Sequence, residues 1–292
     1  GACTVSVPIS GGRVLELALE PGGQTLTGTL GDGMVTTAVT GERNRWSAAD
    51  PATVHVGRWN AGLQIPVEAE GQEAVPQGDG FTSITVTNTG ATTLAGRLAD
   101  GSVLTGAGFV TGAGTVLVQQ FFDGGLSSVQ GWSALNGASA LRWVKGAQGP
   151  GSRTYAAGFG PLNLAVNSAL HVAPGSGQIL MGLPNAAGNA RLALKAGGLA
   201  APLNLVFRLT TTHQVVVPNP NTNLLTLTVS PVTGRYSGRF TMSDGGVTRQ
   251  AQVEGLVLGG QGAGYFLLPK VEMPMATAPI LSGQAVLEAT GP

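Results

Sequence analysis

Apolar and polar residues alternate along many short runs of this chain, and most runs end at glycine or proline. Residues 14–19, 84–87, 203–207 and 225–229 are examples. A period of two places every second side chain on one face of a β-strand, and Thr and Val suit a half-buried pleat. The best helical candidate is the Ala-rich stretch 184–194, where we expect a loop. The pattern predicts an all-β protein.

Aspartate marks the expected turns, because five of the six aspartates stand directly before a glycine. Asp-Gly is a strong signal for tight hairpin turns. Calcium loops instead need several oxygen ligands within about a dozen residues, and each of these aspartates stands alone. We therefore interpret all five pairs as turns: Asp32-Gly33, Asp79-Gly80, Asp100-Gly101, Asp123-Gly124 and Asp244-Gly245.

Three segments repeat one pattern, namely an alternating strand, a glycine turn, a second strand with a central glycine, and an Asp-Gly pair. They are residues 15–33, 84–101 and 225–245, with central glycines Gly28, Gly96 and Gly238. A glycine inside a strand marks a bulge, a bend or a close backbone approach. Repeated bends are what a closed sheet needs. We predict antiparallel hairpin repeats that form one or two small β-barrels or a barrel-like sandwich.

Charge is scarce and balanced, with 15 Lys+Arg against 15 Asp+Glu and only 10% charged residues, where roughly 25% is usual. The chain therefore carries no electrostatic signature of nucleic-acid binding. A sparsely charged, neutral surface favours self-association, although a coding bias toward Gly and Ala gives the same composition. No apolar run reaches the ~18 residues of a membrane helix, so we expect no membrane span.

Cys3 is the single cysteine, so the chain makes no internal disulfide and no cysteine metal site. The start Gly1-Ala2-Cys3 is similar to the end of a lipoprotein signal, which would make Cys3 a lipid attachment point. The alternation of Cys3, Val5 and Val7 instead suits an ordinary strand, and we favour that interpretation. We expect any export signal to have been removed or to lie outside this sequence.

Several short glycine- and aromatic-containing motifs span most of residues 12–288 and lie at 78–81, 94–101, 131–132, 141–145, 155–159, 262–267 and 282–287. Together they resemble a glycine-rich β module of large exported surface proteins in environmental Gram-negative bacteria. The resemblance implies a secreted, structural role at the cell surface, with no known activity and no cofactor. These motifs are structural and carry no chemistry.

The order of the motifs raises a question about the two ends of the chain. In similar modules, strands like 234–266 precede a segment like 4–8, whereas here they follow it. We expect an N-terminal segment (1–75) that packs with C-terminal strands (216–292) around a central module (76–215). The C-terminal strands either close the sheet within one chain or pair with the next subunit, giving a head-to-tail fibre. The candidate assembly residues are Thr4, Val5, Val7, Phe240, Val253, Tyr265 and Phe266.

No arrangement of residues indicates catalysis. The histidines His55, His171 and His213 are far apart in sequence, and the one acidic cluster, Glu68, Glu70 and Glu73, flanks a glycine in an expected loop. Nucleophile-elbow and zinc-protease motifs are missing. We expect no enzyme, no cofactor and no metal site.

Aromatic side chains are the remaining candidates for ligand contact. Trp46, Trp59 and Trp132 could stack on sugar rings, or they could fill gaps in an aromatic-poor core. The sequence thus predicts an extracellular structural or adhesive module that associates with itself or with a surface matrix. The alternative is a carbohydrate-binding module that recognises a polysaccharide.

Overall fold

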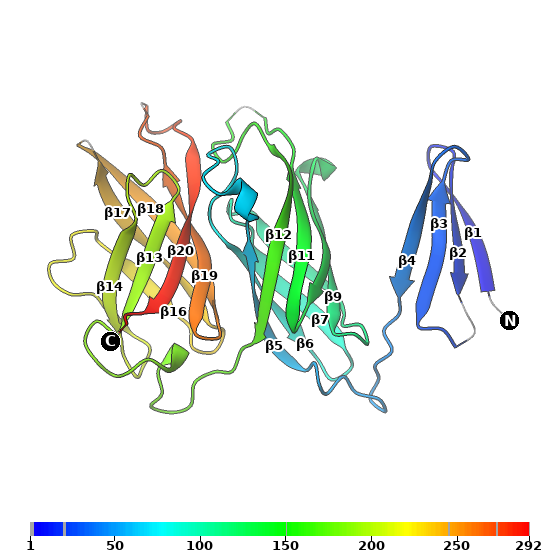
Figure 1. The fold of residues 1–292 in the computed structure, drawn as a ribbon, viewed down its shortest axis with the longest axis horizontal. Helices are drawn as coiled ribbons and strands as arrows, with labels where there is room; N and C mark the ends of the chain where they lie inside the picture. The colour runs from blue at the N-terminus through cyan, green and yellow to red at the C-terminus, as the bar shows by residue number, and fades with distance from the viewer. Residues whose placement is uncertain (1–2, 20–21, 150, 245, 273, 292) are drawn as a thin grey trace.

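The computed structural model describes residues 3–19, 22–149, 151–244, 246–272 and 274–291 and consists of three antiparallel sheets that follow one another along the chain (Figure 1). Its few helical turns are short 3₁₀ segments, η1 (Val67–Ala69), η2 (Asp123–Gly125) and η3 (Leu180–Gly182). The prediction of an all-β, barrel-like protein is confirmed. No helix in the described part of the chain is long and apolar enough to cross a membrane.

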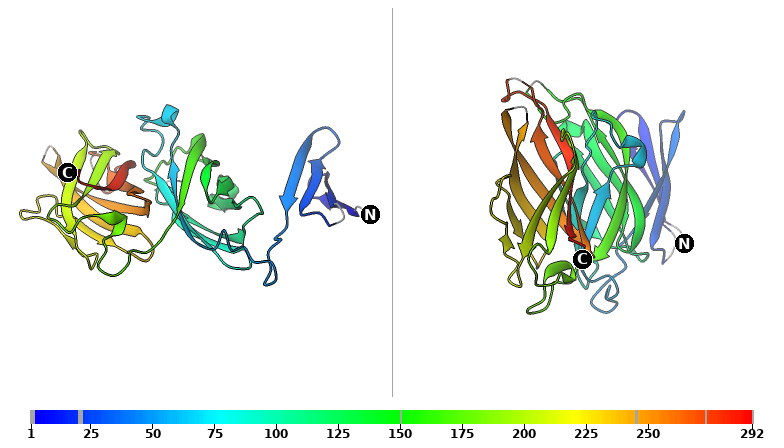
Figure 2. Two further views of the ribbon diagram at one scale, coloured as in Figure 1. Left: turned by 60° about the horizontal axis from the view of Figure 1, so that its bottom comes forward. Right: turned by 60° about the vertical axis from the view of Figure 1, so that its left-hand side comes forward.

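The first sheet, called here the N-terminal sheet, is a meander of four strands in the order β1-β2-β3-β4. It stands beside the rest of the molecule and is joined to it by one connecting segment (Figures 1 and 2). Its strands are β1 (Cys3–Ile9), β2 (Arg13–Leu19), β3 (Thr25–Gly31) and β4 (Thr36–Glu42).

The second sheet, called here the middle barrel, has eight strands in the order β8-β7-β6-β5-β12-β11-β10-β9. Two four-stranded meanders join where β5 pairs with β12. Opposite this join, the side-chain amide of Gln120 links β9 to β8, accepting from the Thr105 N–H (2.7 Å) and donating to the Val103 carbonyl (3.0 Å). The strands are β5 (Gly57–Gln64), β6 (Gly80–Val86), β7 (Ala91–Arg97), β8 (Val103–Phe109), β9 (Thr115–Phe122), β10 (Ser127–Ala134), β11 (Gly137–Lys145) and β12 (Phe159–Leu170).

The third sheet, called here the C-terminal barrel, also has eight strands, in the order β15-β14-β13-β20-β19-β18-β17-β16. Residues 184–189 form the loop that we expected, but the strand β13 already begins at Ala190. The strands are β13 (Ala190–Ala196), β14 (Leu203–Leu209), β15 (Val215–Val216), β16 (Thr226–Val229), β17 (Arg235–Asp244), β18 (Val247–Leu258), β19 (Gln261–Pro269) and β20 (Ile280–Ala289).

Alternation fills the inside of each barrel with apolar side chains. In the middle barrel, the fully buried Trp143 packs edge-on against Phe159 with their ring centroids 4.8 Å apart. In the C-terminal barrel, Phe240 and Phe266 meet in the same manner at 5.6 Å. Every second residue of a strand faces inward, so a period of two supplies a closed core once the sheet is curved.

The central glycines allow that curvature, because a β-carbon at each would collide with a backbone carbonyl of the preceding strand. The pairs are Gly28 with Glu16, Gly96 with Phe81 and Gly238 with Thr226. The same contact in all three sheets shows that the sequence repeat is also a structural repeat. Gly28, Gly96 and Gly238 therefore occupy equivalent positions of one curved hairpin.

The outer faces of the two barrels pack against each other. Phe81 on β6 stacks on Tyr265 of β19 with centroids 6.2 Å apart. The buried Asn60 side chain of β5 donates hydrogen bonds to the carbonyls of Thr233 (2.9 Å) and Val257 (3.0 Å). The guanidinium of Arg153 crosses the junction to the Ala278 carbonyl (2.8 Å). Apolar packing and directional hydrogen bonds together fix the two barrels against each other.

The sheets divide the chain differently from the expected segments 1–75, 76–215 and 216–292. The C-terminal strands β16–β20 pair with one another, and β20 also pairs with β13 of the same chain. Strands β1–β4 pair among themselves, so the expected pairing between the N- and C-terminal strands of one chain does not form. From the first 75 residues, β5 packs against β18 and β19, and Glu73 in the loop after β5 pairs with Lys270.

The Asp-Gly pairs are only partly the hairpin turns that we expected. Asp123 and Gly124 both have positive φ (53° and 66°). At Asp100-Gly101 only the glycine has a positive φ (89°), and the Asp100 carboxylate accepts a hydrogen bond from the Ser102 N–H at 2.9 Å. Asp32-Gly33 is similar, and Asp79-Gly80 leads into β6 without a turn. Gly245 lies outside the described residues.

A prediction follows for the curved hairpin. Gly96→Ala should destabilise the protein by about 2–3 kcal/mol, because its methyl group meets the Phe81 carbonyl and the sheet must flatten. Gly106→Ala on the neighbouring β8 is the matched control. Its β-carbon has the Leu94 Cβ as nearest neighbour at 3.8 Å, so we expect a change below about 0.5 kcal/mol. Urea denaturation of both variants measures the difference, and equal midpoints would contradict this role of Gly96.

Candidate interaction surfaces

The N-terminal sheet has one apolar face and one polar face. The strand register places nine apolar side chains on the same face: Val5, Val7, Ile9, Leu15, Leu17, Leu19, Leu26, Leu30 and Val39. The opposite face is rich in threonine, including Thr4, Thr25, Thr27, Thr29, Thr36 and Thr40. None of the described residues of this sheet is buried. The apolar face therefore lies open, and Val5 is 50% exposed.

The equivalent positions of the two barrels are buried. The residues two before and two after the central glycine are at most 6% exposed. They are Leu94 in β7 and Leu98 directly after it in the middle barrel, and Tyr236 and Phe240 in β17 of the C-terminal barrel. The residue opposite the glycine on the next strand is Leu104 or Val253, both fully buried.

In the N-terminal sheet the corresponding residues Leu26, Leu30 and Val39 are half-buried. Burial of a Leu or Val side chain contributes about 1.5–3 kcal/mol, so this open face leaves a large stabilisation unrealised. A contiguous apolar patch of this kind marks an interaction surface.

The expected assembly residues fall into two groups. Thr4, Val5 and Val7 lie on the exposed edge strand β1, and Cys3 at its start is an exposed free thiol. Phe240, Val253 and Phe266 are core residues of the C-terminal barrel, and Tyr265 lies in the junction between the barrels. The structure does not bring the two groups together. Residues 1–2 of the lipoprotein-like start lie outside the described residues.

The tryptophans take three different environments. Trp46 lies on the segment after β4 and donates its indole N–H to the Val110 carbonyl at 2.8 Å, at one end of the middle barrel. Trp59 on β5 is 9% exposed and donates to the His55 carbonyl (2.8 Å). Both anchor structure rather than forming an open platform.

Trp132, in contrast, is 40% exposed on the outer face of β10, directly across from Leu117 of β9. A groove of about 320 Å³ runs beside it and is lined also by Gln119, Thr105 and Glu42. An exposed indole beside hydrogen-bonding side chains is the arrangement that sugar rings use. Of the three expected stacking residues, Trp132 is the one that the structure makes accessible.

The histidines and the glutamate cluster form no catalytic arrangement. His55 contacts Trp46, His171 lies 3.0 Å from the Pro231 carbonyl, and His213 accepts the Leu180 N–H at 3.2 Å. Glu73 pairs with Lys270 at 2.6 Å. Among the described residues no group of three or more His, Cys, Asp or Glu side chains is placed to hold a metal ion.

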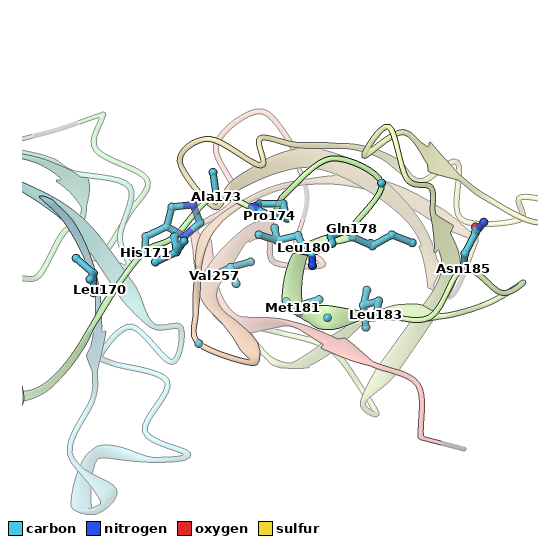
Figure 3. Close-up of a pocket in the computed structure, with 15 residues that line it drawn as sticks. Leu170, His171, Ala173, Pro174, Gln178, Leu180, Met181, Leu183, Asn185 and Val257 are labelled. Carbon is cyan, nitrogen blue, oxygen red and sulfur yellow. The ribbon is translucent and has the colours of Figure 1, made fainter.

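A cavity of about 600 Å³ lies at one end of the C-terminal barrel. Residues 170–185 wrap around it, and His171 and Asn185 lie at opposite ends (Figure 3). Most of the side chains between them, such as Leu180, Met181 and Leu183, are apolar. The cavity brings no acid and base together, so it offers no catalytic pair.

Asp79 is a buried carboxylic acid that sequence reasoning assigned to a turn. It lies in the junction between the barrels, 3% exposed, in a groove of about 470 Å³ that both barrels line. Burial raises the pKa of Asp79 to about 6. The Gln284 amide N–H (2.8 Å) and the positive charge of Lys195 act in the opposite direction, and Glu70 adds to the rise. The alternation pattern gave no signal for this site, because Asp79 is buried by a different domain.

Comparison with known proteins adds no relative, since no protein-family model matches this chain and the search of curated proteins found no significant match.

A prediction follows for Asp79. Its pKa is higher in the folded protein than the usual 3.8, so it favours folding most below pH 4, and this contribution is lost as the pH rises through 6. The loss amounts to roughly 2–3 kcal/mol. Asp79→Asn keeps an acceptor for Gln284 without the charge, and we expect it to remove this part of the pH dependence. Thermal denaturation of both proteins from pH 4 to 7.5 tests this prediction. If the melting temperatures of variant and wild type depended on pH in the same way, the role of Asp79 would be contradicted.

Proposed function

We propose that this protein is a non-enzymatic extracellular structural or adhesive module, and that it assembles through the open apolar face of its N-terminal sheet. The observation that carries this proposal is the equivalence of the three curved hairpins. Positions that form the core of both barrels are uncovered in the N-terminal sheet. Low charge and the resemblance to exported surface modules support the extracellular role.

The same chain indicates what covers such a face. In the middle barrel, the meander β5–β8 encloses its core together with a second meander, β9–β12. The counterpart proposed for the N-terminal sheet is therefore another curved four-stranded sheet with an apolar face. The N-terminal sheet of a second copy has both properties, and the contact would be isologous, with the same surface on each chain.

This geometry changes the assembly that we expected from the sequence. A head-to-tail fibre needs unoccupied C-terminal strands, whereas β16–β20 are paired within the C-terminal barrel. Contact between two N-terminal sheets joins two chains at one end and leaves the barrels at the outer ends. The barrels then remain available for contact with a surface matrix.

A pair of substitutions on β1 tests the proposal. Val7 lies on the apolar face and the neighbouring Ser6 on the polar face of the same strand. Val7→Glu should convert a dimer into a monomer, because a buried unpaired carboxylate costs several kcal/mol. Ser6→Glu adds the same charge to the solvent face and should leave the dimer intact. Light scattering coupled to size-exclusion chromatography gives the mass of each.

The wild-type mass is itself decisive. A wild-type protein that remains a 29.3 kDa monomer at high micromolar concentration contradicts self-assembly through this face. Equal loss of association in Ser6→Glu and Val7→Glu also contradicts it, since the effect would then not depend on the face.

A second candidate function is polysaccharide binding at Trp132, favoured by the exposed indole and its adjoining groove. Trp132→Ala should abolish the retardation of the protein in gels containing a neutral polysaccharide, because the packing of the C–H face of a sugar ring on the indole is lost. Phe121→Ala, at an exposed position on β9, is the control and should keep the retardation. Equal retardation of both variants and wild type would contradict a role for Trp132.

A further inference from the structure

A further pocket, of about 300 Å³, opens at the edge of the junction between the two barrels. Three arginines line it, Arg58 on β5, Arg97 on β7 and Arg235 on β17. The chain has only twelve arginines, so a quarter of them gather at one small opening. They come from both barrels, and the pocket therefore depends on the junction.

The positive charges in the pocket exceed the negative ones. Arg97 and Arg235 share a single carboxylate, Glu254, with 3.1 Å between the Arg97 Nε and a Glu254 oxygen. Arg58 donates its Nη1 hydrogen bond to the neutral hydroxyl of Ser83 at 2.9 Å. Three guanidinium groups thus face one carboxylate, although the chain as a whole is neutral. An anionic group in the pocket would balance this excess.

The shape of guanidinium favours a carboxylate as that group. Arginine presents a planar fork of donors that matches the two oxygens of a carboxylate, and such charge-assisted hydrogen bonds are stronger than neutral ones. Of the three arginines, Arg58 is best placed to bind a carboxylate, because its partner is the Ser83 hydroxyl, which a carboxylate can displace.

The remaining walls suit a sugar ring. Phe81 and Leu256, both buried, form the apolar floor of the pocket. Ser83, Thr105 and Thr233 line the same pocket. Their hydroxyl groups both donate and accept, as the hydroxyls of a sugar do. A ligand that carries hydroxyl groups beside its carboxylate would pair with all three of these side chains.

We infer that this pocket binds a uronic acid residue of an acidic polysaccharide, with the sugar carboxylate held by Arg58 and Arg235. This inference is independent of the proposed self-assembly, because it involves different elements of the fold.

Titration calorimetry with galacturonic acid oligomers tests the inference on the full-length chain. We expect binding that weakens as salt is raised, whereas any binding of neutral galactose oligomers should not change with the salt concentration or with Arg58→Gln. Arg58→Gln should weaken binding about tenfold, and the Arg58→Gln/Arg235→Gln double variant more than that. Arg58 has no ion pair among the described residues, so the single variant tests the pocket without disturbing the Glu254 contacts. Thermal denaturation confirms that both variants are folded.

Arg142→Gln is the matched control, because Arg142 is exposed on β11 and lies outside this pocket. It should bind like the wild type. Three results would overturn the inference: no binding of the oligomers, equal weakening by Arg142→Gln or Trp132→Ala, or equally tight binding of an oligoglutamate peptide. The last result would make the pocket a site for acidic protein segments instead.

Discussion

An antiparallel sheet with one apolar face is stable only when something covers that face, and the curved hairpin of this protein meets that requirement by closing on itself. Gly28, Gly96 and Gly238 let neighbouring strands approach until the sheet bends, and bending turns a flat apolar face into the inside of a barrel. Eight strands complete that inside in the middle and C-terminal barrels. The N-terminal sheet has four strands, which form half of such a barrel. The curved hairpin therefore builds two closed cores and also leaves one apolar surface open.

The period of two and the central glycines were sufficient to predict strands, faces and curvature, because these properties depend on neighbours in sequence. Which strands pack against one another depends on contacts between segments far apart in sequence, and the alternation pattern does not predict those contacts. Phe240 and Val253 illustrate this difference. The alternation of apolar and polar residues in β17 and β18 is consistent with an apolar face at these positions. Strands of the same barrel bury both side chains, so they are core residues and not assembly residues. Trp46 and Trp132 are both followed directly by a serine in sequence. The fold alone shows that Trp46 anchors structure and that the Trp132 ring is exposed.

The junction between the barrels carries the chemistry that local sequence patterns missed. Asp79 appears in a turn-forming Asp-Gly pair, but the C-terminal barrel buries it beside Gln284 and raises its pKa. Arg58, Arg97 and Arg235 are separated by up to 177 positions, and the packing of Phe81 on Tyr265 brings their strands together. Because the barrels are held by apolar stacking and by hydrogen bonds from Asn60 and Arg153, these groups keep a fixed spacing. A fixed spacing is what a binding pocket requires and a flexible linker cannot provide.

The way in which the N-terminal sheet is exposed also favours contact through its face over contact through its edge. Strand β1 is the outer strand of the sheet, and an unprotected outer strand is a template for indiscriminate pairing. Pro8 lies within β1 and lacks an N–H, so it removes a hydrogen-bond donor from this edge. The apolar face has no comparable block, since one charged residue, Arg13, shares it with nine apolar side chains. Edge protection combined with an open face therefore supports the proposed contact with a second copy of the sheet through the apolar face over pairing along β1.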